Sequence, residues 1–169
     1  MRGGNAHLAE EFRMVCHRGD IHRAIQSDLA HGAVRIVVRI TRRYRDSSIT
    51  QRVILYADLP RVDFEAELDW REAGSYRTGI PMLRVSFNTP LHNAVRTYEL
   101  PYGWIERDAE GVEWPALQWV DLSEADYGVS LLNDNKHGFN MEGGTIRMTL
   151  VRSPYSPDGL PDYGWQTAR

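Results

Sequence analysis

The sequence has a single cysteine, no long hydrophobic run and no marked excess of either charge. Because Cys16 is the only cysteine among 169 residues, no disulfide can form within the chain, which favours a reducing compartment. No segment approaches eighteen apolar residues, and residues 1–7 contain no apolar signal core, so we expect a cytoplasmic protein without a membrane span. The net charge of -3, from 20 basic and 23 acidic residues, does not favour nucleic acid or an anionic membrane as a partner.

Size and composition are those of one folded domain. Hydrophobic residues make up 42% of the chain and charged residues 25%, which is globular rather than disordered composition. We expect residues 1–31 to form a polar N-terminal segment with an edge strand or a short helix. Residues 32–156 are predicted to form the folded domain. Residues 157–169 are predicted to be a tail, because Pro157 and Pro161 break regular structure.

Period-two alternation is the main secondary-structure signal. The clearest run has five apolar residues alternating with charged ones, namely Val62, Phe64, Ala66, Leu68 and Trp70. Since successive strand residues point to opposite faces, this strand has one buried and one wet face, which is typical of antiparallel sheets. Similar patterns and polar turns predict a meander over residues 33–71 and further strands to residue 152. The fold class is therefore predicted as all-β, an antiparallel β-sandwich of two sheets, with one helical turn at Leu122–Asp126.

The charged face of that strand has two interpretations. Its four carboxylates, Asp63, Glu65, Glu67 and Asp69, are candidates for a pair of catalytic acids. Same-face neighbours on a strand are about 7 Å apart, whereas retaining glycosidases hold their two carboxylates about 5 Å apart. We therefore favour a solvated face whose acids meet arginines of neighbouring strands, namely Arg35, Arg39 or Arg52.

A cluster of possible zinc ligands lies near the N-terminus. His17, Asp20 and His22 fall within six residues, beside Cys16. Three ligands on one short stretch need a distant fourth ligand and supporting hydrogen bonds. We favour a polar surface turn over a metal site.

Two late segments carry a family resemblance. Residues 127–139 read Tyr-Gly-Val-Ser-Leu-Leu-Asn-Asp-Asn-Lys-His-Gly-Phe, and residues 146–154 read Ile-Arg-Met-Thr-Leu-Val-Arg-Ser-Pro. Together with the strands that precede them from about Gly32, they resemble, in order, the late β-domain of the family 38 glycoside hydrolases, the retaining α-mannosidases. The resemblance implies a portion of a galactose-mutarotase-like supersandwich.

In that family the β-domain packs against an α/β domain that holds zinc and an aspartate nucleophile. The family's zinc signature is a His, one residue, and an Asp, and this sequence contains no His-x-Asp. The resemblance therefore assigns no catalytic residue, metal ligand or cofactor to this chain, and it implies zinc in a catalytic domain that these residues do not contain.

The best candidates for substrate binding or a domain interface lie in the polar loop and the last matched strand: Asn133, Asp134, Asn135, Lys136, His137 and Arg152. The resemblance implies that both face the catalytic domain, where Arg152 would reach a hydroxyl or a carboxylate. Asn and Asp also bond their own backbone in turns, so a purely structural role stays open. Three tryptophans, Trp104, Trp114 and Trp119, are candidates for stacking on sugars, although aromatic residues at strand spacing more often pack in a core.

We therefore expect a non-catalytic C-terminal β-domain of an α-mannosidase that shapes the sugar site and is inactive as an isolated chain. Its partners would be a mannoside or other carbohydrate, and the missing catalytic α/β domain or a second copy of itself. The alternative is a free-standing carbohydrate-binding or assembly module. A mutarotase-like epimerase is a third option, and it would need His92 or His137 beside an acid in a cleft.

Overall fold

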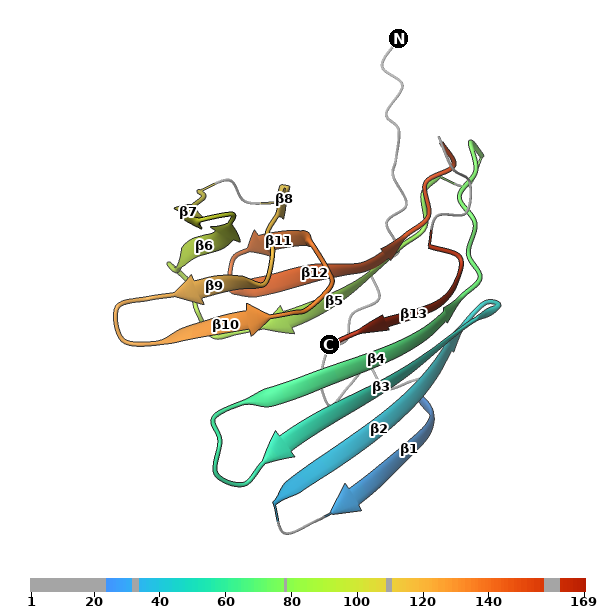
Figure 1. Cartoon of the computed structure of the whole chain (residues 1–169), viewed down its shortest axis with the longest axis horizontal. Helices are drawn as coiled ribbons and strands as arrows, with labels where there is room; N and C mark the ends of the chain where they lie inside the picture. The colour runs from blue at the N-terminus through green and yellow to red at the C-terminus, as the bar shows by residue number, and fades with distance from the viewer. Residues whose placement is uncertain (1–23, 32–33, 78, 109–110, 157–161) are drawn as a thin grey trace. The chain divides into compact units, whose positions relative to one another are not determined.

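The computed structural model describes residues 24–31, 34–77, 79–108, 111–156 and 162–169 (Figure 1). Within these ranges the chain forms strands and turns and no helix, and therefore no helix that is long and apolar enough to cross a membrane. Two compact units share the chain. Of the described residues, those in 24–82 and 151–169 belong to the first unit, and those in 83–150 belong to the second. The predicted all-β class with antiparallel pairing is confirmed.

The first unit contains a five-stranded sheet in the order β1-β2-β3-β4-β13. Its strands are β1 (Ala24–His31), β2 (Arg35–Tyr44), β3 (Ser47–Tyr56), β4 (Val62–Trp70) and β13 (Gly164–Ala168). Antiparallel hydrogen bonding joins each neighbouring pair. Strand β1, at one edge, lies inside the segment for which a strand or a helix was expected. Strand β13, at the other edge, lies inside the predicted tail and pairs with β4 (Figure 1).

The predicted alternation is visible in the pairing of β3 with β4. Ile49 lies opposite Leu68, and Gln51 lies opposite Ala66, so these residues share one face. All four are buried, Leu68 completely, and so is Trp70. The register places apolar residues of both strands on the same buried face. A slip of one residue would move these side chains to the solvent face and destabilise the pairing.

The opposite face of the same sheet is charged. Arg52 contacts Glu65 at 3.2 Å and Glu67 at 2.8 Å, and Tyr56 donates a hydrogen bond to Asp63 at 2.7 Å. These contacts confirm that the acids of β4 meet Arg52 across the sheet. Each carboxylate contact stabilises the pairing only modestly because the groups are partly exposed to water.

Buried polar groups tie the end of β4 to a segment far along the chain. The indole N–H of Trp70 donates to the hydroxyl of Ser153 at 2.8 Å, and the Ser153 N–H donates to the Pro81 carbonyl at 3.0 Å. Ser153 is fully buried and Trp70 is 2% exposed. Nearby, Ser47 donates to Glu72 at 2.8 Å. The partners satisfy groups that would otherwise be costly to bury.

The second unit contains two four-stranded sheets, ordered β10-β9-β6-β7 and β5-β12-β11-β8. The first has β6 (Val95–Leu100), β7 (Gly103–Glu106), β9 (Trp119–Ser123) and β10 (Gly128–Leu132), and the second has β5 (Met82–Asn88), β8 (Glu113–Pro115), β11 (Gly138–Glu142) and β12 (Thr145–Arg152). The first sheet contributes fully buried Tyr98, and the second contributes nearly or fully buried Phe139 and Ile146. Burial raises the pKa of the Tyr98 phenol, so that it stays neutral in the core.

The structure corrects several details of the sequence prediction. No helical turn forms at Leu122–Asp126, because Leu122 is buried as part of β9 and pairs with Arg96 and Val129. Among the further strands expected up to residue 152, residues 113–123 form two, β8 and β9, which lie in different sheets. Strand β11 was not predicted separately, because its sequence mixes glycine and asparagine with apolar residues. The described strands form three sheets, whereas two were predicted.

The buried Trp70–Ser153 hydrogen bond gives a stability prediction. Replacing Ser153 by Ala leaves the indole N–H buried without its acceptor, so the free energy of unfolding in urea should fall by about 1–3 kcal/mol. The exposed Ser156 provides the matched control, and Ser156→Ala should change the free energy of unfolding by less than about 0.5 kcal/mol. Equal effects of the two substitutions would show that this hydrogen bond does not stabilise the fold.

Candidate functional site

The polar loop between β10 and β11 is organised by Asn133. Its side-chain oxygen accepts the backbone N–H groups of Asn135 at 3.1 Å and Lys136 at 2.6 Å, and its side-chain nitrogen donates to the Leu117 carbonyl at 3.2 Å. The Asn133 backbone N–H donates to Gln118 at 2.8 Å. Only 8% of Asn133 is exposed. It therefore fixes the turn and joins it to the chain before β9.

The other candidates of the loop point less inward. Asp134 and His137 are exposed and Lys136 is half-buried. A ring nitrogen of His137, Nδ1, lies 3.2 Å from the Ala116 carbonyl, and the His137 carbonyl accepts the Ala116 N–H at 3.1 Å. The loop thus holds three polar side chains at its surface on a backbone that hydrogen bonds keep in place.

Arg152 belongs to the first compact unit, and the loop belongs to the second. The backbone N–H of Arg152 donates to the Asp162 carboxylate at 2.7 Å, and the residue is exposed. The structure therefore holds the loop candidates on one turn of the second unit, and Arg152 belongs to the first unit.

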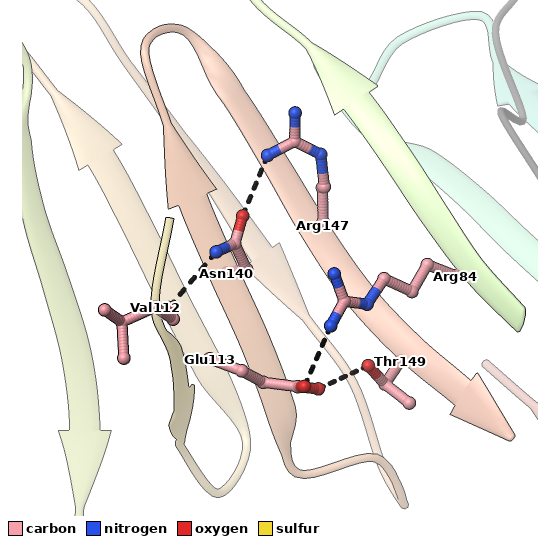
Figure 2. Close-up of polar contacts among 6 residues, drawn as sticks. All are labelled: Arg84, Val112, Glu113, Asn140, Arg147 and Thr149. Atoms are coloured by element: carbon pink, nitrogen blue, oxygen red, sulfur yellow. Dashed lines mark hydrogen bonds and ion pairs between the residues drawn. The ribbon is translucent and has the colours of Figure 1, made fainter. Parts of the chain in front are cut away.

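A polar network crosses β5, β8, β11 and β12, and its residues were not singled out from the sequence (Figure 2). Glu113 accepts hydrogen bonds from Arg84 at 2.9 Å and from Thr149 at 2.5 Å. Asn140 accepts from Arg147 at 2.8 Å and donates to the Val112 carbonyl at 3.2 Å. In the sequence, Arg147 and Thr149 alternate with apolar residues along β12, which indicates a polar strand face but not the partners of these side chains.

The network joins the strands of this sheet face through side-chain hydrogen bonds. Asn140 is 5% exposed, and its amide satisfies groups on two neighbouring segments. A side chain at Gly138 would place its Cβ 2.6 Å from a Glu113 carboxylate oxygen, so glycine leaves the space that the acid occupies. The charges here are paired with one another, which leaves little for a ligand to satisfy.

A surface groove lies over β6, β7, β9 and β10, with a volume of 980 Å³. We call it the Trp104–Trp119 groove after two of its lining residues. The strand register puts one polar row across its floor, in which neighbours lie directly opposite each other: Ser130, Asp121, Thr97 and Glu106. Trp104 on β7 is 62% exposed, and Trp119 on β9 is partly exposed.

The third tryptophan candidate is engaged elsewhere. The guanidinium of Arg107 lies 4.0 Å from the Trp114 ring centroid and 5.7 Å from that of Tyr98. Such stacking is a favourable cation–π arrangement. Trp114 is therefore covered on one face by Arg107, whereas Trp104 and Trp119 line the groove.

Glu124 holds the backbone in place at one end of the groove. Its carboxylate accepts the backbone N–H groups of His92 at 2.8 Å and Asn93 at 2.9 Å. The hydrogen bond from Asn93 has the larger effect and that from His92 the next. Both lower the pKa of the Glu124 carboxyl, because they stabilise its charged form. The acid thereby fastens the segment before β6 to the turn after β9.

Among the described residues, no three side chains of His, Cys, Asp or Glu are grouped so as to hold a metal ion. The described residues therefore do not fit a zinc site. The possible ligands His17, Asp20 and His22, with Cys16, lie outside the described residues.

Comparisons with known proteins agree with one another. Residues 18–160 match the family model described as glycosyl hydrolases family 38 C-terminal domain. Alpha-mannosidase G of Dictyostelium discoideum is 36% identical over 149 residues, which cover 80% of this chain and 13% of that protein. Alpha-mannosidase 2C1 of Mus musculus is 32% identical over 127 residues, which cover 70% of this chain and 12% of that protein.

A solved structure shows the same fold. The crystal structure of an alpha-mannosidase from Enterococcus faecalis V583 superposes with a TM-score of 0.64 at 15% identity. The superposition covers 85% of this chain and 21% of that one. The chain thus spans a small part of the length of the proteins it resembles.

The hydrogen bonds of Asn133 predict that it is needed for stability. Asn133→Ala removes the acceptor of two backbone N–H groups, so the free energy of unfolding should fall by about 1–3 kcal/mol in urea. Asp134→Ala, at the exposed neighbouring position, is the control and should change it by less than about 0.5 kcal/mol. A stable Asn133→Ala protein would mean that the loop does not depend on this side chain.

The lowered pKa of Glu124 predicts a pH-dependent anchor at the groove. Because the folded-state pKa is depressed, the stabilisation is present above the unfolded-state pKa and is lost as the pH falls through the folded-state pKa. In an NMR titration, the His92 and Asn93 amide shifts should follow the Glu124 carboxyl below its usual pKa. Glu124→Gln should remove this pH dependence, and Asp126→Asn should retain it. A Glu124 carboxyl that titrates at its ordinary pKa would contradict the anchor.

Proposed function

The chain belongs to the C-terminal domain family of the family 38 glycosyl hydrolases, and on that premise we propose that it serves as the non-catalytic β-domain of an α-mannosidase. Hydrolysis of the α-mannoside is assigned to a zinc-bearing catalytic domain outside these residues. The β-domain shapes the sugar site and forms the interface with that domain.

The family match over residues 18–160 carries this proposal. Two α-mannosidases share 36% and 32% identity with this chain, which corresponds to only 13% and 12% of their length. The sequence contains no His-x-Asp pair, and the described residues do not fit a zinc site. Because a retaining mechanism needs two carboxylates about 5–5.5 Å apart across the scissile bond, the acids of β4, which are tied to Arg52 and Tyr56, are poor candidates.

The loop of Asn133 suits a supporting role at a sugar site. Its backbone is held by four hydrogen bonds of Asn133, so Asp134, Lys136 and His137 are presented on a rigid turn. A carboxylate accepts hydrogen bonds from hydroxyl groups, and an ammonium donates hydrogen bonds to hydroxyl oxygens. Together they can pair with both the donors and the acceptors of a polyol. Preorganised groups of this kind lose little entropy when a ligand or a partner domain meets them.

Arg152 fits the interface part of the proposal. Its side chain is exposed, while its backbone is fixed by Asp162. The planar guanidinium can form two parallel hydrogen bonds with a carboxylate of the catalytic domain or with vicinal hydroxyls.

The isolated chain should not hydrolyse a mannoside. We expect no turnover of p-nitrophenyl α-mannoside by the purified 169-residue chain, with or without added zinc, because the proposal assigns the groups that form the glycosyl-enzyme intermediate to the catalytic domain. A full-length α-mannosidase assayed in parallel shows that the conditions support hydrolysis. Turnover by the chain that a chelator abolishes would overturn the proposal, and Asp134→Asn would then locate the activity in or outside the loop.

A further inference from the structure

We propose that the Trp104–Trp119 groove is a binding site for a neutral saccharide. The site consists of two accessible indoles above a row of hydroxyl and carboxylate groups on the face of β6, β7, β9 and β10. It involves none of the loop residues to which the sugar-site role is assigned, so it is an additional site and does not depend on that role.

The two indoles form a stacking platform. Trp104 lies opposite Glu99, and the Glu99 carboxylate accepts the backbone N–H of Trp119 at 3.1 Å, so the two tryptophans flank β6 on the same face. With neighbouring strands about 4.8 Å apart, the tryptophans are about 10 Å from each other. An aromatic face attracts the polarised C–H groups of a pyranose ring, and it loses little entropy because the side chain has few rotatable bonds. Two indoles at this spacing can each contact one unit of a short oligosaccharide.

The carboxylates supply the hydrogen-bond acceptors that such a ligand needs. Ser130 donates to one oxygen of Asp121, which orients this carboxylate in the middle of the row. The Glu106 and Asp126 side chains make no hydrogen bond or ion pair within the described residues, and both line the groove. Hydrogen bonds from sugar hydroxyls to ionised carboxylates are stronger than those between neutral groups.

The charge of the groove selects among saccharides. Among the described residues, its lining includes four acids, Glu106, Asp121, Glu124 and Asp126, and no Lys or Arg. A phosphorylated or carboxylated sugar would therefore meet uncompensated like charge, whereas a neutral hexose would not. We infer a specificity for neutral saccharides, with mannosides as the first probes.

The same composition argues against a protein partner as the occupant. The cores of protein interfaces are depleted in Asp and Glu and enriched in Arg. This groove has the opposite balance. Its volume of 980 Å³ also falls in the range of small-molecule sites.

The five indole N–H resonances of the chain provide a direct test. Titration of the full chain with methyl α-mannoside and α-mannobiose, followed by ¹H–¹⁵N NMR, should shift the resonances of Trp104 and Trp119. The other three indoles should not shift. Trp104→Ala and Trp119→Ala should each raise the dissociation constant of the probe roughly tenfold.

Trp165 is the matched control, because it is 71% exposed on β13 in the first compact unit and does not line the groove. Trp165→Ala should bind the probes as the unaltered chain does. Shifts confined to residues 133–137, or no shift at tens of millimolar of either probe, would overturn the proposal. Neither result would bear on catalysis by a separate domain, which the mannoside assay tests by itself.

A second variant tests selectivity with little risk to folding. Glu106→Gln keeps the shape of an exposed side chain and removes one negative charge. Mannose 6-phosphate should bind the unaltered chain at least roughly fivefold more weakly than methyl α-mannoside, and Glu106→Gln should narrow this difference. Equal affinity for both sugars in the unaltered chain would contradict the selection by charge.

Discussion

The antiparallel register of the strands is the constraint on which the rest of the structure depends. Because side chains alternate between faces, a slip of one residue would move every buried side chain of a strand to the solvent face. Ile49 opposite Leu68 secures the register in the first unit, and Tyr98 opposite Val120 secures it in the second. In both pairs the two residues are buried. Because burial of these residues fixes the register, it also determines which side chains lie on the opposite face of each sheet.

What the other face displays differs between sheets. In the five-stranded sheet, Arg52 pairs with Glu65 and Glu67, and the charges satisfy one another. On β8, β11 and β12, Glu113, Asn140 and Arg147 are likewise engaged within the protein. On β6, β7 and β9, indoles and acids share a concave surface instead. Strand alternation thus gives two sheet faces whose polar groups pair within the protein and one face that is suited to a ligand.

The sequence was sufficient where information is local. The alternation from Val62 to Trp70 correctly predicted that Ala66, Leu68 and Trp70 are buried on one face of β4, although Val62 at the start of the strand is 45% exposed. The ordered motifs indicated the family. It was insufficient where partners are distant. The bond from Asn133 to Leu117 spans 16 residues, and the groove requires the registers of four strands, although Trp104 and Trp119 were candidates for sugar stacking. The helical turn predicted at Leu122–Asp126 was wrong because strand pairing outweighed the local capping signal.

The most direct test of the central claim is disulfide cross-linking across β6 and β9. Thr97 and Asp121 lie opposite each other on the groove face, so a Thr97→Cys/Asp121→Cys protein, with Cys16 replaced by Ser, should form a disulfide on oxidation. A Thr97→Cys/Val120→Cys protein should not, because Val120 points to the buried face. Cross-linking of the second pair and not the first would contradict the register, and with it the groove.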